Sequence, residues 1–331
     1  MNYLIIGLGS AGQRHLRVLH KFLGNNANIY IYRGNHKRGL ISDDLHHENL
    51  SINPVEFYNA SEINTIAELA EKTWELVIIA TPPDSHYFYV QKLIATSKKI
   101  LIEKPLTVET IEALKIINLA ELNNVPVLTG YQMTFHPFKD FIKDNISYIG
   151  EIKSCATVFR EDLSLMNPFR SMENHHLSKP EGGGVFLSLS HDLDFLLTIF
   201  DQSFADHIFF TNTQFSDNGS LVECTFNCTI RSELNNVNLK SKYSILPSHT
   251  CKTGEIQGSR AGIQWDFVSG IIELKEHSGK VTNILSCLID KDELFRSQIE
   301  NILSHRNYSE YCQNNLNRAK FIVEANTNIY S

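Results

Sequence analysis

The chain has 331 residues, of which 42% are hydrophobic and 20% charged, and its formal net charge is −7. This composition is typical of a globular protein with a sizeable core, and the length suits two domains better than one. The acidic balance argues against a general nucleic-acid binder, and no apolar stretch approaches the length of a membrane span.

Targeting and metal signals are weak throughout the chain. The first apolar run is short and passes directly into a glycine-rich turn, so we expect no signal peptide. The six cysteines form no Cys-x-x-Cys pair, which favours a cytoplasmic protein. The adjacent His175 and His176 lack a partner at helical spacing, and we expect no metal site.

A glycine-rich turn follows the first strand candidate. Tyr3–Ile6 ends in Gly7-Leu8-Gly9-Ser10-Ala11-Gly12 and leads into a helical pattern. Gly7 permits the tight turn, Gly9 lets the backbone approach phosphates, and Gly12 lets helix and strand pack closely. The free N–H groups of the turn, those of Ser10 and Ala11 included, suit a pyrophosphate. The sequence predicts a dinucleotide-binding turn, the alternative being a turn that holds no nucleotide.

Strand and helix candidates alternate up to about residue 129. The strand candidates are Tyr3–Ile6, Ile29–Tyr32, Glu75–Ala80, Ile100–Glu103 and Val125–Leu128. The helix candidates include Ser61–Lys72, Ser85–Ala95 and Val108–Asn123. Such alternation predicts a dinucleotide-binding α/β domain over residues 1–129, with a doubly wound parallel sheet of the Rossmann type.

The pattern changes beyond Gly130. Strand candidates with period-two alternation or short apolar runs are Lys153–Phe159, Ser220–Ile230, Asn236–Ile245, Glu255–Gly258, Ile263–Phe267, Gly270–Glu276 and Val281–Leu285. Helical patterns cover about Leu187–Phe200, Asp292–Leu303 and Ser309–Asn328. Residues 130–331 are therefore predicted to form an α+β domain with a large, mostly antiparallel open sheet, whose last helix packs back on the first domain.

The end of the second strand bears on the choice of dinucleotide. NAD-selective folds usually place an acid there to bind the ribose 2′-hydroxyl, but the segment from Tyr30 to Arg38 has none. It carries Arg33, Lys37 and Arg38, which would pair a 2′-phosphate, and Arg33 could also stack on the adenine. We expect NADP(H), with NAD(H) as the alternative. The competing interpretation is a solvated basic loop.

Two further motifs follow strand candidates and complete a family pattern. Ala80-Thr81-Pro82-Pro83-Asp84-Ser85-His86 follows the third strand, and Glu103-Lys104-Pro105 follows the fourth, at strand ends where open sheets bind ligands. With the glycine turn they resemble the family of glucose–fructose oxidoreductase, inositol dehydrogenase and their relatives (Gfo/Idh/MocA). The similarity continues through residues 130–137, Phe169-Arg170-Ser171 and residues 182–194.

The resemblance implies hydride transfer between a nicotinamide and a carbon that bears a hydroxyl or carbonyl, usually on a sugar, nucleotide sugar or cyclitol. It implies a homodimer or homotetramer built through the C-terminal sheet. It also assigns roles to residues. Thr81, Pro82, His86, Glu103 and Lys104 would lie at the cofactor.

Catalysis, by the same resemblance, would rest on Lys104 and His191. The Lys104 ammonium would stabilise a developing alkoxide, and the His191 imidazole would take or return the hydroxyl proton. Asp194, three residues further along a helix, could orient that ring. Purely structural roles remain as alternatives: Lys104 as a surface lysine, and His191 as a histidine hydrogen-bonded in the domain interface.

One position departs from the family pattern. Many relatives have Asp or Glu shortly before the histidine, where this chain has Ser188. Either the Lys–His pair suffices, or Asp192 or Asp194 compensates, or the chain binds without catalysing. The further substrate candidates are Tyr131, His136 and Arg170, the last of which could hold a phosphate or carboxylate.

The leading hypothesis is an NADP(H)-preferring oxidoreductase that reduces a sugar or nucleotide sugar. The first alternative is an NAD-dependent dehydrogenase of a cyclitol or sugar. The second, from another class, is a non-catalytic dinucleotide-binding or sensor protein.

Overall fold

The computed structural model describes residues 1–24, 27–34, 38–43, 47–162, 184–200, 205–217, 219–231, 236–246 and 249–329. Contacts among Cα atoms divide the chain into two units. Of the described residues, the first unit contains 1–130 and 291–323, and the second contains the rest.

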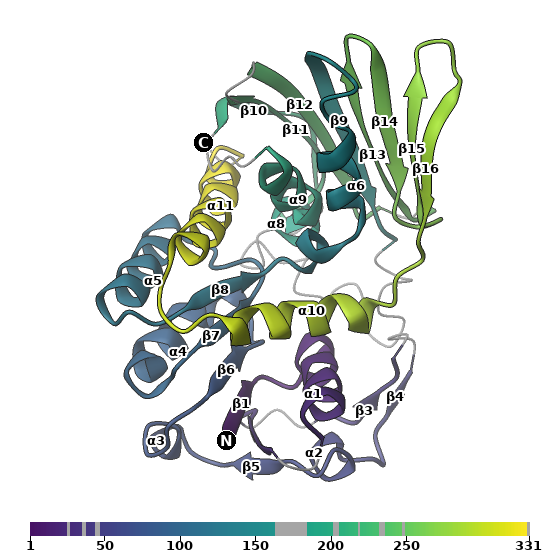
Figure 1. Ribbon diagram of the computed structural model, residues 1–331. Coiled ribbons are helices and arrows are strands. Elements are labelled where there is room, and N and C mark those ends of the chain that lie inside the picture. Colours follow the sequence, from purple (N-terminus) through teal and green to yellow (C-terminus); the bar gives the residue numbers. More distant parts are fainter. Residues whose placement is uncertain are drawn as a thin grey trace. The chain divides into compact units, whose positions relative to one another are not determined.

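The first unit is built on a six-stranded parallel sheet with the order β5-β2-β1-β6-β7-β8 (Figure 1). Its strands are β1 (Asn2–Ile6), β2 (Asn28–Tyr32), β5 (Ser61–Ile63), β6 (Leu76–Ile79), β7 (Ile100–Glu103) and β8 (Val127–Gly130). Every residue of β6, β7 and β8 is buried, as parallel strands covered on both faces require.

Helices cover both faces of this sheet (Figure 1). The long ones are α1 (Ser10–Leu23), α4 (His86–Leu93), α5 (Thr110–Leu122), α10 (Lys291–Ser304) and α11 (Glu310–Thr327). One apolar cluster joins α1, α10 and the sheet through residues such as Leu16, Ile299 and Ile5. The predicted doubly wound parallel sheet is therefore confirmed.

Short elements fill the rest of the first unit. They are the pair β3 (Leu40–Ile41) and β4 (Glu48–Asn49), the helices α2 (Pro54–Phe57) and α3 (Ile66–Leu69), and two 3-10 turns at Pro83–Ser85 and Ile94–Thr96.

The predicted helix Ser61–Lys72 is wrong. Ser61–Ile63 forms edge strand β5, and only Ile66–Leu69 is helical. Thr65 ends the extended segment, because its side chain accepts a hydrogen bond from the Glu68 N–H and so caps the short helix.

The second unit contains an eight-stranded sheet with the order β10-β11-β12-β9-β13-β14-β15-β16. Its strands are β9 (Ile152–Arg160), β10 (Ala205–Phe215), β11 (Leu221–Arg231), β12 (Asn236–Ser244), β13 (Cys251–Gly258), β14 (Ala261–Asp266), β15 (Ile271–Glu276) and β16 (Val281–Ser286). All neighbours are antiparallel except β9 and β12. The predicted large, mostly antiparallel sheet is confirmed.

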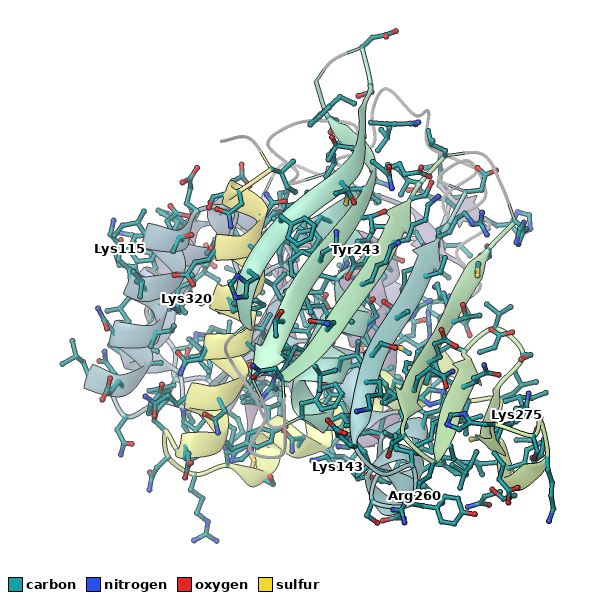
Figure 2. All side chains as sticks on the ribbon, turned by 90° about the horizontal axis from the view of Figure 1, so that it is seen from above. Lys115, Lys143, Tyr243, Arg260, Lys275 and Lys320 are labelled. Carbon is teal, nitrogen blue, oxygen red and sulfur yellow. The ribbon has the colours of Figure 1, made fainter. Side chains whose placement is uncertain are left out.

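One face of this sheet is apolar and packs on helices. These helices are α6 (Phe138–Asn145), α8 (Gly184–Leu189) and α9 (His191–Ile199). A 3-10 turn at Gln132–Phe135 precedes α6. The Phe186 ring of α8 contacts the rings of Phe226 and Tyr243, and the Phe195 ring of α9 contacts that of Trp265 (Figure 2, where Tyr243 is labelled). The predicted helix Leu187–Phe200 is in fact two helices separated at Ser190.

Candidate functional site

The glycine turn between β1 and α1 has the geometry that its motif predicts. Gly7 has a φ of +88°, and a Cβ there would lie 2.6 Å from the Ala80 carbonyl oxygen. A Cβ on Gly12 would lie 2.0 Å from the Gly7 carbonyl oxygen. A Cβ on Gly9, by contrast, would meet nothing within 4 Å. Gly7 and Gly12 therefore close the turn, while the backbone at Gly9 is open to a bound group.

The start of α1 offers donors to that open space. Ser10 is the first helical residue, and Gly9 precedes it without any side-chain cap. The first N–H groups of a helix have no partner within it, and they carry the positive end of its dipole. An oxygen-rich anion such as a pyrophosphate fits these donors, which include the N–H groups of Ser10 and Ala11.

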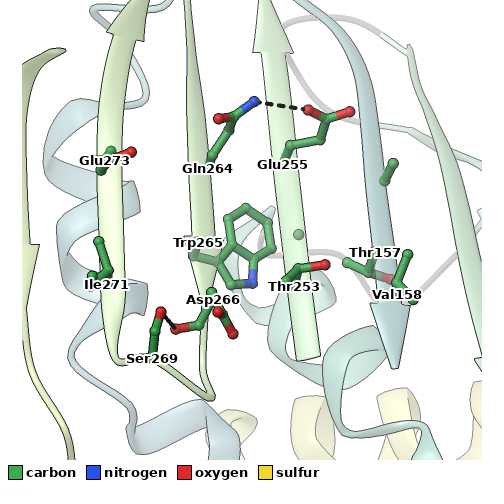
Figure 3. A pocket seen from close by; sticks show the side chains of 12 residues that line it. Thr157, Val158, Thr253, Glu255, Gln264, Trp265, Asp266, Ser269, Ile271 and Glu273 are labelled. Atoms are coloured by element: carbon green, nitrogen blue, oxygen red, sulfur yellow. Dashed lines mark hydrogen bonds between the residues drawn. The ribbon is translucent and has the colours of Figure 1, made fainter. Parts of the chain in front are cut away.

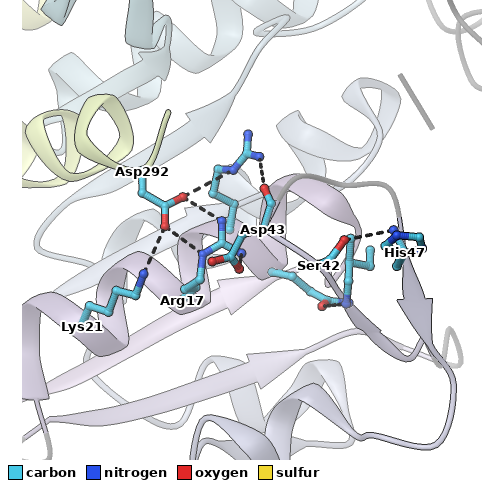
Figure 4. Close-up of polar contacts among 9 residues, drawn as sticks. Arg17, Lys21, Ser42, Asp43, His47 and Asp292 are labelled. Carbon is cyan, nitrogen blue, oxygen red and sulfur yellow. Dashed lines mark hydrogen bonds and ion pairs between the residues drawn. The ribbon is translucent and has the colours of Figure 1, made fainter. Parts of the chain in front are cut away.

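Charged residues anchor α1 to α10 (Figure 4). The Arg17 guanidinium donates to both carboxylate oxygens of Asp292, at 2.8 and 2.7 Å, and also pairs with Asp43 at 2.9 Å. Lys21 reaches Asp292 at 3.4 Å. Burial raises the pKa of Asp292, but the hydrogen bonds and charge of Arg17 outweigh it and hold the pKa below its usual value. These ion pairs thus hold α1, the helix that follows the glycine turn, against α10.

The end of β2 differs from the sequence expectation. Arg33 donates from Nε and Nη2 to the two oxygens of Glu62, at 2.7 and 2.9 Å. Arg38 lies 3.6 Å from Glu48. The segment from Tyr30 to Arg38 has no acid of its own, but Glu62 of the neighbouring strand β5 supplies one at this position. Lys37 lies outside the described residues.

The loop after β6 is held by buried polar contacts. The Ser85 hydroxyl donates to Thr81 Oγ1 at 2.7 Å, and Pro82 precedes the 3-10 turn. His86 is fully buried, with Nε2 2.9 Å from the Thr81 carbonyl oxygen and Nδ1 3.0 Å from that of Leu106. Burial lowers its pKa, although both carbonyls act in the opposite direction. Because it is enclosed, His86 braces the loops after β6 and β7 and does not offer its ring to a cofactor.

The loop after β7 is tied to α1. Glu103 is 8% exposed, and its Oε1 accepts a hydrogen bond from His15 Nε2 at 2.6 Å. Burial raises the pKa of Glu103, but the His15 hydrogen bond and the charges of His15 and Lys104 hold it below its usual value. Lys104 itself is half-buried. The side chain of Glu103 thus binds α1, and its neighbour Lys104 is the more accessible of the two charged residues.

In the second unit, His191 is the first residue of α9 and is partly exposed. The buried ring of Tyr131 lies 6.0 Å from the His191 ring, nearly perpendicular to it. The fully buried Asp194 accepts a hydrogen bond from the Thr134 hydroxyl at 2.7 Å. Asp194 therefore fixes the beginning of α9 to the turn that also carries Tyr131.

Asp192 anchors the same helix to the sheet. Its carboxylate accepts hydrogen bonds from Thr157 at 2.5 Å and from the Tyr243 hydroxyl at 2.9 Å. Thr157 is bonded in turn to Ser241 at 2.7 Å. Burial raises the pKa of Asp192 to about 6, against the hydrogen bonds that lower it. Asp192 and Asp194 hold α9 in two directions, and His191 directly precedes Asp192 in the sequence.

Two of the substrate candidates, His136 and Ser188, have side chains that are engaged within the second unit. His136 is buried against Phe138 and Phe267, and burial lowers its pKa to about 4, so its ring is enclosed by aromatic side chains and is not open to a substrate. The Ser188 hydroxyl donates to the Gly184 carbonyl within α8. Arg170, like His175 and His176, lies outside the described residues.

Three residues near these motifs escaped the sequence reasoning: His15, Glu62 and Asp192 as a sheet anchor. His15 had a detectable signal, because it lies four residues before the buried Leu19 and so on the same face of α1. Glu62 had none, since its contact with Arg33 depends on the pairing of β2 with β5.

A hollow of about 510 Å³ lies elsewhere, on β9, β13, β14 and β15 of the second unit (Figure 3). Thr253, Glu255, Gln264 and Glu273 are among its lining residues, and Gln264 donates to Glu255 at 3.3 Å. None of the predicted site residues lines it. In the described part of the chain, no group of three or more His, Cys, Asp or Glu side chains is placed to hold a metal. None of the helices described combines the length and apolar character of a membrane span.

Known proteins resemble the first unit in sequence and the whole chain in fold. Residues 1–131 match the model of the oxidoreductase family with an NAD-binding Rossmann fold, Gfo/Idh/MocA. A dTDP-3,4-didehydro-2,6-dideoxy-α-D-glucose 3-reductase of Saccharopolyspora spinosa is 28% identical over 87 residues, which are 26% of this chain and 26% of the reductase. Across the curated relatives that match, the aligned segments span only 26% to 40% of each relative's length.

Two solved structures share the fold across nearly the whole chain. The 3-ketoreductase KijD10 of Actinomadura kijaniata, a Y186F mutant in complex with TDP-benzene and NADP, has a TM-score of 0.74 at 16% identity, covering 99% of this chain and 97% of that one. The super-repressor mutant of Gal80p from Saccharomyces cerevisiae has a TM-score of 0.75 at 16% identity, covering 100% and 95%. With the glycine turn and the Glu103-Lys104-Pro105 loop in place, residues 1–131 are similar to the NAD-binding Rossmann domain of the Gfo/Idh/MocA oxidoreductase family, and the first unit has the parallel sheet of that fold.

Proposed function

We propose that the chain is an NAD(P)(H)-dependent oxidoreductase that reduces a keto carbon of a sugar or nucleotide sugar, with NADP(H) as the preferred cofactor. The observation that carries this proposal is the open backbone at Gly9 in front of α1, on the same unit as the half-buried Lys104. The similarity to a nucleotide-sugar 3-reductase supports the substrate class.

The chain's own residues divide the work. The N–H groups at the start of α1 bind the pyrophosphate, and the Thr81-Pro82 loop and the Glu103 loop border the same strand ends. The bound nicotinamide supplies the hydride. The Lys104 ammonium stabilises the negative charge that develops on the reacting oxygen, and the His191 imidazole moves its proton. The Tyr131 ring and the hydrogen bond of Asp194 to Thr134 position His191.

The preference for NADP(H) rests on Arg33 and Arg38. Both lie just beyond β2, where the adenosine ribose of a dinucleotide is bound in this fold. A guanidinium can pair a 2′-phosphate with two parallel hydrogen bonds. Direction follows from cofactor choice, since a cell keeps NADP(H) mainly as a reductant.

Assembly of two or four copies would use the polar face of the large sheet. Residues of β12 alternate between buried and exposed, so that Asn238 and Lys240 point away from the helices while Val237 and Leu239 are in the core. An open sheet face of this kind can pack against a second copy. Light scattering of the purified chain at several concentrations measures the assembly.

The direct test uses NADPH deuterated at the transferable position and a panel of nucleotide-linked keto-sugars. We expect deuterium in the product. Lys104→Ala and His191→Ala should each lower kcat by about 10²- to 10⁴-fold while NADPH still binds. Lys98→Ala, which removes an exposed lysine paired with Glu75, is the matched control and should leave kcat unchanged.

A second function, from another class, is favoured by one observation. Ser188 stands where many relatives have an acid. Its hydroxyl donates a hydrogen bond to the Gly184 carbonyl, and it supplies no carboxylate. A non-catalytic dinucleotide-binding protein would bind NADPH without turnover, and the Lys104→Ala variant would behave as the parent does. Retained binding with no deuterium in any product of the panel would favour this reading over the reductase.

A further inference from the structure

Arg33 and Glu62 form a two-bond ion pair at the end of β2. Arg33 is the residue after that strand, and Glu62 lies in β5 with its Cα paired to that of Ile31. The guanidinium donates through Nε and Nη2, one bond to each carboxylate oxygen, at 2.7 and 2.9 Å. This parallel arrangement is the strongest geometry for an Arg–carboxylate pair.

The pair is placed to meet a ligand. The Arg33 side chain is 5% exposed, whereas that of Glu62 is 30% exposed, so the carboxylate is the more accessible partner. The Gly7 N–H donates to the Tyr32 carbonyl at 2.8 Å, which ties the glycine turn to the residue just before Arg33. In a Rossmann fold the ribose of the adenosine lies beyond this strand end.

Charge at this position is balanced in the residues that the structure describes. Glu62 neutralises Arg33, and Glu48 lies 3.6 Å from Arg38 while also accepting a hydrogen bond from the Gly39 N–H. A 2′-phosphate that approaches Arg33 must therefore share it with a carboxylate. A 2′-hydroxyl meets a carboxylate that can accept its hydrogen bond.

We infer that Glu62 is a specificity-determining residue for the dinucleotide. Its carboxylate accepts the ribose 2′-hydroxyl of NAD(H) and competes with the 2′-phosphate of NADP(H) for Arg33. The chain consequently accepts both dinucleotides, and Glu62 limits the preference that Arg33 and Arg38 would give alone. This inference rests on the proposed function, because it concerns the same cofactor.

The test compares Glu62→Gln with the parent and with Glu48→Gln, the matched control at Arg38. Dissociation constants for NADPH and NADH are measured by nicotinamide fluorescence on the full chain. Displacement by adenosine 2′,5′-bisphosphate and by 5′-AMP reports the ribose end alone. For Glu62→Gln we expect NADPH to bind about tenfold more tightly, since one charge-assisted interaction is no longer contested. NADH should not bind more tightly, and Glu48→Gln should shift the NADPH-to-NADH ratio less.

An unchanged ratio in a folded Glu62→Gln variant overturns the role of Glu62 while leaving the proposed function standing. Failure of the parent to bind either dinucleotide overturns the proposed function as well. If Glu62→Gln does not fold, Glu62→Asp decides, because its shorter carboxylate cannot keep both bonds to Arg33; a shift of the ratio toward NADPH supports the inference, and an unchanged ratio overturns it.

Discussion

The two units of the chain hold their candidate functional residues in different ways. In the first unit these residues follow the ends of parallel strands, and short local motifs carry them. In the second, His191 begins a helix that buried carboxylates fix to a distant strand and to a distant turn. Chain order alone brings residues together at the edge of a parallel sheet. The second unit depends on contacts between segments far apart in sequence.

The first unit also contains one such long-range contact, between His15 of α1 and Glu103 at the end of β7, and it provides the strongest test of this difference between the units. His15→Ala would leave the Glu103 carboxylate buried without the hydrogen bond from His15 and would remove the edge-on contact of the His15 ring with Phe295. We expect a loss of about 3–5 kcal/mol in the free energy of unfolding, measured by urea denaturation. His15→Gln keeps a donor and should lose less. Equal stability of His15→Ala and the parent would show that α1 and the loop after β7 are independent.

Asp192 tests the anchoring of the second unit. Its pKa rises from 3.8 to about 6 in the folded state, so the unfolded chain releases this proton first as the pH increases. The carboxyl therefore contributes stability at low pH that is lost between about pH 4 and 6, up to about 3 kcal/mol. Asp192→Asn should remove this component.

Urea denaturation at pH 4, 5, 6 and 7 measures the Asp192 effect as the difference between variant and parent. The free energy of unfolding of Asp192→Asn should gain on the parent as the pH rises through this range, with the exposed Asp140→Asn as control. Parallel curves for Asp192→Asn and the parent would contradict the raised pKa.

Two glycines of one motif separate folding from binding. A Cβ on Gly12 would lie 2.0 Å from a backbone oxygen, so Gly12→Ala should cost about 1–3 kcal/mol or more in stability. A Cβ on Gly9 has no neighbour within 4 Å, so Gly9→Ala should fold normally yet bind NADPH at least about tenfold more weakly. Thermal denaturation and fluorescence titration measure the two effects. Similar losses of stability in both variants would remove the distinction.

Much of the first unit could be predicted from sequence, because its strands are short apolar runs that end in recognisable turns. The exceptions are instructive. β5 has three residues, too few for a period to be detected, and Thr65, two residues after its end, is a typical residue at the start of a helix. β10 was not predicted at all, since register irregularities between Asp206 and Phe215 interrupt its alternation.

The candidate site was less predictable than the fold. Motifs located Gly9 and Lys104, but a motif does not say which of its polar residues face inward. His86, Glu103 and His136 are buried because their hydrogen-bond or ring partners come from other segments. The Arg33–Glu62 pair spans two strands that become neighbours only in the folded sheet. Such contacts depend on tertiary structure, and no local pattern encodes them.

The central claim is that the backbone at Gly9 and the start of α1 hold a nicotinamide dinucleotide. Fluorescence titration of the purified chain with NADPH and NADH tests it most directly. The account predicts saturable, one-to-one binding of both, tighter for NADPH, and weakened by Gly9→Ala without loss of folding. Absence of binding to a folded chain, or binding that Gly9→Ala leaves unchanged, would contradict it.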